Sequence, residues 1–255
     1  MLRSPRTRRI GKLDFVLAGA QKSGTTALHY FLQKHPQITM GDRQEMHFFD
    51  DEEIFSKPPD YESLHRRYPR VSPQTLAGDC TPNYVFWEPA AARIARYHPA
   101  IKLVILLRNP VDRAFSHWNM QRHKKREPLD FLEALKAEPD RITPPLTLAS
   151  RRFSYVARGW YSQQLERFFK LFPREQIKVV KFEQFRNEQR ATLDSIFTFL
   201  GLKALGPVTN RRRNVVPYRR EMTEEERSHL SRIFAEEIAR LEELLGWDCS
   251  DWKER

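Results

Sequence analysis

The chain has 255 residues, of which 40% are hydrophobic and 30% charged, and its formal net charge is +11. This length and composition predict one folded globular domain, residues 1–255, and exclude a disordered or collagen-like chain. The basic surplus indicates an anionic partner, but charge alone does not distinguish a nucleotide or acidic substrate from nucleic acid or a membrane surface.

Signals for membrane insertion and export are missing from the sequence. No window is long and apolar enough to span a bilayer, so we expect no integral membrane segment. Residues 1–12 are basic but lack the apolar core of a secretory signal, so we expect a frayed leader, with an amphipathic targeting peptide as the alternative. The two cysteines, Cys80 and Cys249, are too few for a disulfide scaffold or a zinc cluster and fit a reducing compartment. Together these features predict a cytoplasmic protein.

The first element, residues 14–30, carries the clearest functional pattern. The apolar run at residues 15–18 is typical of a buried strand, and a helical pattern begins at residue 27. The loop between them, GAQKSGTT, offers the charge of Lys22 and the hydroxyl groups of Ser23, Thr25 and Thr26. A strand, a glycine loop and a helix aim backbone N–H groups at an anion. We therefore predict a phosphate-binding loop, the alternative being an ordinary capped turn.

This loop differs from a Walker A motif in one decisive position. The Walker pattern places lysine directly after the second glycine, followed by a serine or threonine for magnesium. Here Thr25 follows Gly24, and Lys22 lies upstream. We therefore expect a phosphate to be held with different geometry and without a required metal ion.

A second candidate site follows a short strand predicted at residues 37–40. In the segment QEMHFFD, residues 44–50, Glu45 and His47 are two positions apart. If the segment is extended, both side chains point to one face, where a carboxylate and an imidazole form a candidate general-base site. The alternative is a solvated loop anchored by Phe48 and Phe49.

The next segment, residues 51–75, is predicted to be irregular, with one short helix at about residues 61–68. A short strand then ends near Asp79, Cys80 and Thr81, ahead of a helix at about residues 89–97. Side chains just past the carboxyl end of a parallel strand line a crevice, so these three are candidate pocket residues. The alternative is that Thr81 and Pro82 only form a turn.

The apolar run at residues 103–107 is the strongest buried-strand signal in the chain. Nucleotide-hydrolysing P-loop proteins place an acidic residue for magnesium after this strand, but here Arg108 follows, which suits direct phosphate binding. Pro110 is expected to start a helix that carries Ser116 toward the same anion. The alternatives are a surface ion pair between Arg108 and Asp112, and a purely structural role for Ser116.

Further elements alternate between helix and strand. We predict helices at residues 128–135, 155–171, 191–200 and 221–245, a strand at 177–182, a basic run at 121–125 and a mobile proline-rich stretch at 138–145. Arg211, Arg212 and Arg213 form a basic cluster in a loop that could clamp a second phosphate. The alternation predicts an α/β fold, a three-layer sandwich with a mainly parallel central sheet and a P-loop-like nucleotide-binding arrangement.

Taken together, these motifs resemble the sulfotransferases that use 3′-phosphoadenosine 5′-phosphosulfate (PAPS). Residues 22–26 (KSGTT) resemble the family's 5′-phosphosulfate loop, and residues 106–116 resemble its 3′-phosphate site. Residues 45–49 (EMHFF) and 81–84 (TPNY) resemble segments of the heparan-sulfate-type carbohydrate branch. Weaker similarities extend the resemblance over nearly the whole chain, at residues 159–161, 172–176 and 199–201.

The resemblance implies sulfuryl transfer from PAPS, leaving 3′-phosphoadenosine 5′-phosphate (PAP), with no metal required. Lys22 would stabilise the leaving group, and Ser23 with the N–H groups of Gly24, Thr25 and Thr26 would hold the 5′-phosphate. Arg108 and Ser116 would bind the 3′-phosphate, and residues 211–213 fall where the family often has a basic loop over the nucleotide.

The catalytic base implied by the resemblance is Glu45, as in the heparan-sulfate-type enzymes, with His47 as the alternative. Many members of that branch carry a lysine just before the Thr-Pro turn, where this chain has Cys80. We therefore expect a bacterial stand-alone member acting on a hydroxyl or amine of a glycan, a lipid-linked sugar or a natural product. The rival interpretations are a P-loop kinase acting on a nucleoside or other small molecule, and a basic nucleic-acid-binding domain. No nucleic-acid-binding motif favours the second, so we expect no nucleic-acid partner.

Overall fold

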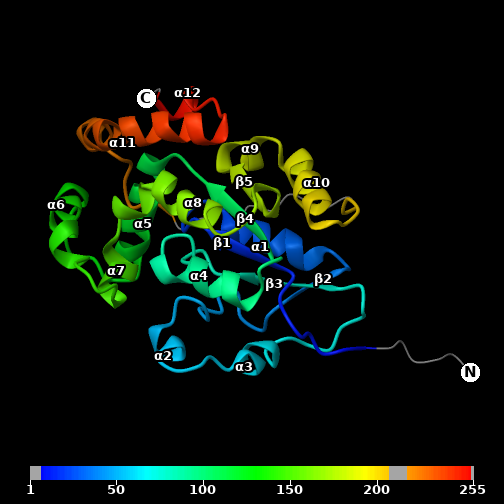
Figure 1. The fold of residues 1–255 in the computed structure, drawn as a ribbon. Helices are drawn as coiled ribbons and strands as arrows, with labels where there is room; N and C mark the ends of the chain where they lie inside the picture. The colour runs from blue at the N-terminus through cyan, green and yellow to red at the C-terminus, as the bar shows by residue number, and fades with distance from the viewer. Residues whose placement is uncertain (1–6, 207–216, 254–255) are drawn as a thin grey trace, which may run out of the picture.

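The computed structural model describes residues 7–206 and 217–253 (Figure 1). Its centre is a five-stranded sheet in the order β2-β3-β1-β4-β5, in which all four neighbouring pairs are parallel. The strands are β1 (Phe15–Gly19), β2 (Ile38–Met40), β3 (Leu76–Cys80), β4 (Lys102–Leu107) and β5 (Ile177–Lys181). The predicted mainly parallel sheet is confirmed.

Helices cover both faces of this sheet, as Figure 1 shows. Side chains of a strand alternate between faces, so Val16 and Leu103 join one apolar cluster, whereas Leu17 and Val104 join the other. The first cluster packs beneath α4 (Glu88–Tyr97), α5 (Pro110–His123), α6 (Phe131–Arg141), α8 (Tyr161–Phe169) and α11 (Glu224–Leu245). The second packs beneath α1 (Thr25–Lys34), α9 (Phe182–Asn187) and α10 (Gln189–Leu200). The three-layer sandwich is therefore confirmed.

The shorter elements lie in the connections. They are α2 (Glu52–Phe55), α3 (Tyr61–His65), α7 (Leu148–Phe153), α12 (Ser250–Lys253) and the 3-10 turns η1 (Ala157–Gly159) and η2 (Arg174–Gln176). None of the helices that the structure describes, including the 22-residue α11, has an apolar stretch of membrane-spanning length.

Local sequence signals account for several helix ends. The side chain of Thr223 accepts from the backbone N–H of Glu226, and the Glu226 side chain accepts from the Thr223 N–H, which is the predicted capping box of α11. Gly201 ends α10 in the left-handed conformation, with φ of 83°.

The helix predicted at residues 155–171 is wrong in its first half. Residues Ala157–Gly159 form a 3-10 turn, and α8 begins only at Tyr161. Gly159 lies against the Phe234 ring, so closely that an added Cβ would be 2.5 Å from it. The break therefore serves the packing of α11, a tertiary contact that a local pattern does not reveal.

The stretch predicted as mobile, residues 138–145, is also partly wrong, because α6 continues through Pro139 to Arg141. The buried carboxylate of Glu138 accepts hydrogen bonds of 2.7 Å from the N–H groups of Val156 and Ala157. These bonds fix the end of α6 against the following segment.

Candidate functional site

The candidate site lies at the carboxyl ends of the strands, beside the boundary between β1 and β4. β1 is the central strand of the sheet, with β3 and then β2 on one side of it and β4 and then β5 on the other. In open parallel sheets this reversal of strand order leaves a crevice between the loops that follow the two central strands. The predicted phosphate loop follows β1, and Arg108 follows β4.

The loop after β1 presents unpaired donors to this crevice. Gly24 is the N-cap of α1, with φ of 88°, and its carbonyl accepts from the N–H groups of Ala27 and Leu28. The N–H groups of Thr25 and Thr26 have no backbone acceptor among the described residues. The first N–H groups of a helix lack partners within the helix and favour an anion.

Arg108 lies directly against this loop. Its Nη1 donates to the carbonyl oxygen of Lys22 at 3.3 Å, and its guanidinium lies over the Phe182 ring, 5.2 Å from the ring centre. The Tyr161 hydroxyl donates to the Arg108 carbonyl at 3.0 Å, which fixes the backbone at the end of β4. The loops after the two central strands therefore meet.

The surface ion pair that we considered for Arg108 is not what the structure shows. Asp112 instead pairs with Arg227 of α11, at 3.2 Å. No acidic side chain within 4.0 Å of Arg108 is found in the described part of the chain. Its charge is therefore available to a ligand.

The charges around Lys22 repel one another. Burial is the main cause that lowers the pKa of Lys22 to about 8, and the neighbouring Arg108, Lys124 and Arg113 lower it further. The carboxylate of Glu45 acts in the opposite direction. Because these cations repel one another, the cluster is suited to binding an anion, which would relieve the repulsion.

The other predicted donor-binding residues are placed less directly. Ser23 and Thr25 are buried, and Thr26 is half-buried, with its Oγ1 accepting from Gln44 Nε2 at 2.9 Å. Ser116 is buried on α5, and no hydrogen bond joins it to Arg108 among the residues described. The predicted basic cluster Arg211, Arg212 and Arg213 lies outside the described residues.

Glu45 and His47 come together, but not as two residues of an extended strand. His47 has φ of 53°, in the left-handed region, so the segment is not extended there and the condition for a shared strand face is not met. Its Nε2 nevertheless lies 3.2 Å from Glu45 Oε2, and its Nδ1 lies 2.9 Å from Asp50 Oδ2. The imidazole is therefore held between two carboxylates.

These carboxylates determine the protonation of His47. Burial alone would lower its pKa, but the hydrogen bonds and charges of Asp50 and Glu45 prevail and raise the pKa to about 9. The ring is therefore an imidazolium at neutral pH, which can donate two hydrogen bonds but has no lone pair with which to accept a proton.

Residues at the end of β3 hold the loop that carries Glu45 and His47 in place through hydrogen bonds. Thr81 Oγ1 accepts from the N–H groups of Met46 and His47 at 3.0 and 3.3 Å and donates to Asp79 at 3.0 Å. The Tyr84 hydroxyl donates to the other oxygen of Asp79 at 2.7 Å. Asp79 is fully buried, and burial raises its pKa to about 6. Asp79 and Thr81 therefore position the loop instead of lining a pocket.

The third pocket candidate of this strand points elsewhere. Cys80 is buried in the apolar cluster beneath α1, with its Sγ 3.9 Å from the carbonyl oxygen of Thr25. Phe48 and Phe49 likewise belong to the core, where their rings pack on Phe55 and each other. They anchor the loop, as the alternative interpretation of that segment expected.

Sequence reasoning missed a polar network behind His47. The buried Asp50 accepts from Asn83 Nδ2 at 2.5 Å, and Arg158 donates to the Asn83 oxygen at 2.6 Å. Arg151 of α7 donates to the backbone oxygen of Asp50 and lies 3.5 Å from its carboxylate. The position of Asp50, three residues after His47, was a usable local signal, whereas its partners come from distant segments.

The two halves of the site touch. Besides the Gln44–Thr26 bond, the carboxylate of Glu45 lies close enough to Lys22 to influence its charge. The arrangement thus places a phosphate-type loop, an arginine and a carboxylate with an imidazolium around one crevice. It can bind a multiply charged anion and remove a proton beside it.

Comparison with known proteins agrees with this geometry. The family model "Sulfotransferase domain" matches residues 12–216. A crystal structure of a sulfotransferase from Alicyclobacillus acidocaldarius superimposes with a TM-score of 0.82 and 31% identity, covering 96% of this chain and 100% of that one.

Two curated relatives are longer than this chain. Heparan sulfate glucosamine 3-O-sulfotransferase 5 of Homo sapiens is 31% identical over 73% of this chain and 53% of its own length. Membrane-associated sulfotransferase kil1 of Dictyostelium discoideum is 25% identical over 92% of this chain and 65% of its own length. The chain therefore spans between about half and two thirds of these relatives.

Proposed function

This chain belongs to the sulfotransferase domain family, and from that premise we propose that it uses PAPS as donor and Glu45 as general base. As a member of that family it is a transferase that moves a sulfonate group. The proposal concerns the identity of the donor, the roles of the residues and the kind of acceptor.

The observation that carries the proposal is the contact between Arg108 and the carbonyl oxygen of Lys22, at 3.3 Å. It brings the cation after β4 onto the loop after β1, so two anion-binding groups share one crevice. A nucleotide with phosphates at both its 5′ and 3′ positions matches such a pair. We assign the 5′-phosphosulfate to Lys22, Ser23 and the amides of Gly24 to Thr26, and the 3′-phosphate to Arg108 and Ser116.

The Phe182 ring lies where the two groups meet. An added Cβ on Gly24 would be 2.7 Å from that ring, and Arg108 stacks on it. Phe182 therefore holds the arginine against the loop and offers an apolar surface to the nucleoside between the phosphates.

In the proposed reaction the acceptor oxygen or nitrogen attacks the sulfur of PAPS. The new bond to sulfur forms as the bond between sulfur and the 5′-phosphate oxygen breaks, and PAP leaves with the additional negative charge. The Lys22 ammonium and the first amides of α1 stabilise that charge, since fixed cations and dipoles need no reorganisation. The acceptor proton passes to Glu45.

The choice between Glu45 and His47 as base follows from the pKa of about 9 for His47. A protonated imidazole cannot accept the acceptor proton at neutral pH, whereas Glu45 is a carboxylate with a half-exposed side chain. We assign His47 the role of orienting Glu45, with Asp50 holding the ring in place.

The proposed acceptor is a hydroxyl or amine of a glycan, a lipid-linked sugar or a natural product. Relatives named for heparan sulfate 3-O- and N-sulfation act on these two kinds of group, which supports the range. The lysine that heparan-type enzymes carry at the position of Cys80 is absent from this sequence, and Cys80 is buried. An acceptor contact from that position is therefore not part of the proposal.

Calorimetry in magnesium-free buffer with EDTA tests the donor assignment. We expect PAP to bind tightly and ATP and duplex DNA to bind at least tenfold more weakly, which separates this function from a kinase and from a nucleic-acid-binding domain. Arg108→Ala should weaken PAP binding by roughly 2–5 kcal/mol, as for a charge pair that loses one partner. Arg190→Ala, on the exposed surface of α10, is the control. Binding of PAP that survives Arg108→Ala unchanged would remove Arg108 from the site.

Turnover measurements test the base. Glu45→Gln should keep the affinity for PAP and lose a factor of about 10² to 10⁴ in kcat, because general-base catalysis contributes about that much. Full activity of this variant would transfer the role of base to another group.

A further inference from the structure

The last helix of the chain bonds to the neighbours of two residues of the proposed donor site. Figure 1 shows α12 on the same side of the molecule as α9 and β5. Its Trp252 is 3% exposed, and the indole N–H donates to Glu183 Oε2 at 3.1 Å. The carbonyl oxygen of Trp252 accepts from Asn109 Nδ2 at 3.2 Å. Glu183 directly follows Phe182, and Asn109 directly follows Arg108. Trp252 is therefore linked to both partners of the stacking contact between Arg108 and Phe182.

A third hydrogen bond closes these contacts into a triangle, Asn109–Glu183–Trp252. The backbone N–H of Asn109 donates to Glu183 Oε1 at 3.4 Å, so each carboxylate oxygen of Glu183 accepts one bond. The remaining polar group of the Asn109 side chain, Oδ1, accepts from the Val111 N–H at 2.9 Å and caps α5. All of these bonds constrain the backbone at Asn109, and they therefore constrain the direction in which the preceding Arg108 leaves β4.

The strand next to β4 supports this triangle. Lys181, at the end of β5, donates to the side chain of Asp251 and to the carbonyl oxygen of Asp248 at 2.8 Å. Its ammonium also lies 5.2 Å from the centre of the Trp252 ring. These contacts hold α12 against the end of β5, so the position of Trp252 is tied to the sheet itself.

The charge of Glu183 is unfavourable beside an anion site. Burial raises the pKa of Glu183, whereas its hydrogen bonds and the charge of Arg108 lower it. A carboxylate this close to Arg108 repels an incoming phosphate, so it does not help to attract the nucleotide. Its favourable contribution is geometric, because two acceptor oxygens meet two N–H donors from separate segments.

From these contacts we propose that Glu183 and Trp252 are positioning residues for the donor, which fix Arg108 and the Phe182 ring in the orientation that receives the 3′-phosphate. This inference rests on the proposed function, because it takes Arg108 as the 3′-phosphate ligand, and it adds the residues that hold that ligand in place. Glu183 and Trp252 act through Arg108 and make no contact of their own with the nucleotide.

Calorimetry of the full chain with two nucleotides tests the inference. Trp252→Phe removes the indole N–H and keeps a buried aromatic ring. We expect it to weaken PAP binding by about threefold to tenfold, the equivalent of one hydrogen bond. Binding of adenosine 5′-phosphate (AMP), which lacks the 3′-phosphate, should change by less than twofold. Equal losses for both nucleotides, or no loss for PAP, would overturn the proposal.

A second buried indole provides the matched control. Trp87, the N-cap of α4, is 2% exposed, and its Nε1 donates to Glu52 Oε1 at 2.7 Å. Trp87→Phe therefore removes the same kind of bond, between an indole and a glutamate, away from Arg108. It should change PAP affinity by less than twofold. If it weakens PAP binding as much as Trp252→Phe does, the loss is a general effect of the substitution and the positioning role is rejected.

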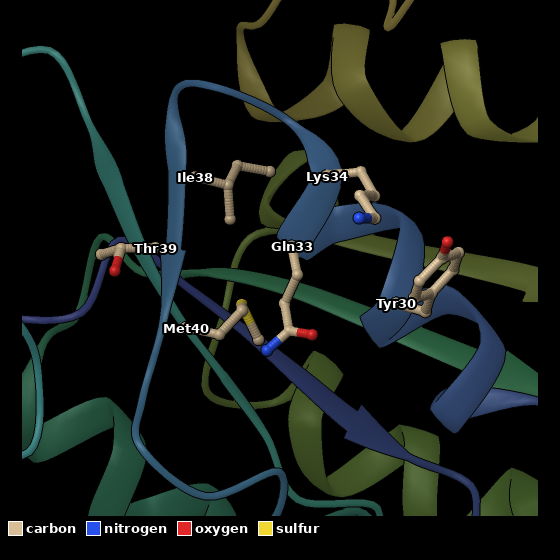
Figure 2. A pocket seen from close by; sticks show the side chains of 6 residues that line it. All are labelled: Tyr30, Gln33, Lys34, Ile38, Thr39 and Met40. Atoms are coloured by element: carbon tan, nitrogen blue, oxygen red, sulfur yellow. The ribbon is translucent and has the colours of Figure 1, made fainter. Parts of the chain in front are cut away.

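A surface control comes from the far end of α1. Figure 2 shows Gln33 pointing toward Met40 in a groove of about 540 Å³ between α1 and β2. Gln33 and Lys34 are the exposed polar side chains of this groove, at the opposite end of the helix from Thr25. Gln33→Ala should therefore leave the affinities for PAP and AMP unchanged and defines the baseline of the measurement.

Glu183→Gln tests the role of the carboxylate by the sign of its effect. If Glu183 acted only through its charge, removing that charge would strengthen PAP binding. The positioning role predicts weaker binding, by about twofold to fivefold, because the amide keeps one acceptor oxygen for two N–H donors. Tighter binding of PAP by Glu183→Gln would overturn the inference.

The indole resonances give a readout that a purely structural contact would not change. The Trp252 resonance is assigned by its absence from the spectrum of Trp252→Phe. PAP should shift it, and AMP should not, because only PAP engages Arg108. A Trp252 resonance that PAP leaves in place would reject the link. If wild-type protein binds PAP and Trp252→Phe binds it equally well, this inference fails and the donor assignment stands. Wild-type protein that does not bind PAP would refute the donor assignment itself.

Discussion

At the scale of single residues, the proposal of Glu45 as base rests on the charge state of His47. The ring is held by Asp50 at 2.9 Å and Glu45 at 3.2 Å, and its pKa is raised to about 9. A raised pKa means that the protonated ring stabilises the folded chain. That stabilisation is complete below the ordinary histidine pKa of about 6.5 and is lost as the pH rises through about 9.

We predict that Asp50→Asn lowers the pKa of His47, because the substitution removes the nearer of its two negative partners. An NMR titration of the histidine ring carbons measures the shift directly. Asp51→Asn is the matched control, since that side chain caps α2 through the N–H of Glu53. If the titration midpoint of His47 stays at about 9 in Asp50→Asn, then Asp50 does not stabilise the protonated ring. The role proposed for Asp50, holding the His47 ring in place, would then be rejected.

Lys22 leads to a second prediction at this scale, concerning the protons taken up with the nucleotide. Its pKa is lowered to about 8, first by burial and then by Arg108, so the free protein is partly deprotonated there at pH 8. The 5′-phosphate of bound PAP adds negative charge beside Lys22 and raises that pKa, so PAP binding at pH 8 to 9 should take up protons, and its affinity should fall as pH rises above about 8.

Calorimetry in buffers of different ionisation enthalpy measures this uptake. Lys22→Arg keeps the positive charge at all these pH values and should abolish most of the uptake. An uptake of the same size in Lys22→Arg would assign the proton to a different group.

The same residues show what local sequence reveals and what it does not. The positions of Lys22 and Arg108 at the ends of two neighbouring strands were predictable, because each follows an apolar run that forms a central parallel strand. The partners of Asp50 were not, because Asn83 is 33 residues away and Arg151 is 101 residues away. No spacing rule connects such segments, so the hydrogen bonds that support the proposed base became visible only in the folded chain.

At the scale of elements, the start of α1 depends on Gly24 for two separate reasons. Its φ of 88° is unfavourable for any residue with a Cβ, and the Phe182 ring occupies the place where that Cβ would go. Gly201, at the end of α10, has a similar φ of 83° but nothing within 4 Å. Substitutions at the two glycines can therefore be compared to separate the cost of backbone strain from the cost of steric contact.

We predict that Gly24→Ala destabilises the protein by roughly 2–4 kcal/mol and Gly201→Ala by about 1 kcal/mol, because only the first adds a clash to the strain. Urea unfolding with a constant m-value measures both. Only Gly24→Ala should also weaken PAP binding, since it moves Phe182 away from Arg108. Equal destabilisation by the two substitutions would mean that Phe182 yields without cost.

Elements were predicted best where one local signal dominates. The strands at Phe15–Gly19 and Lys102–Leu107 follow from buried apolar runs, and α11 follows from its capping box. The break before α8 was missed because it depends on the contact of Gly159 with Phe234, more than seventy residues later in the chain. The continuation of α6 through Pro139 was missed because a buried carboxylate, Glu138, stabilises the helix end.

At the scale of the whole molecule, part of the positive charge lies at the crevice after β1 and β4. The formal net charge is +11, and Lys22 experiences Arg108, Lys124 and Arg113 together. Arg113 is buried, whereas Lys124 lies at the exposed end of α5. The exposed cation can attract an anion from solution before any contact forms, and the buried one cannot be reached by it.

We therefore predict that salt slows the association of PAP more than it changes catalysis. Raising the salt concentration from 0.1 to 1 M shortens the screening length from about 10 to 3 Å, so long-range attraction disappears while contacts inside the crevice persist. Stopped-flow association rates should fall by about tenfold or more, with kcat changed by less than twofold. Lys124→Gln should lower the low-salt rate and its salt dependence, and Lys170→Gln, on the exposed end of α8, should leave both unchanged. If both variants slow association equally, the net charge attracts the nucleotide and the local field at Lys22 contributes nothing. If only Lys124→Gln slows association, the end of α5 contributes to capture of the nucleotide, although Lys124 lies outside the residues proposed to contact it.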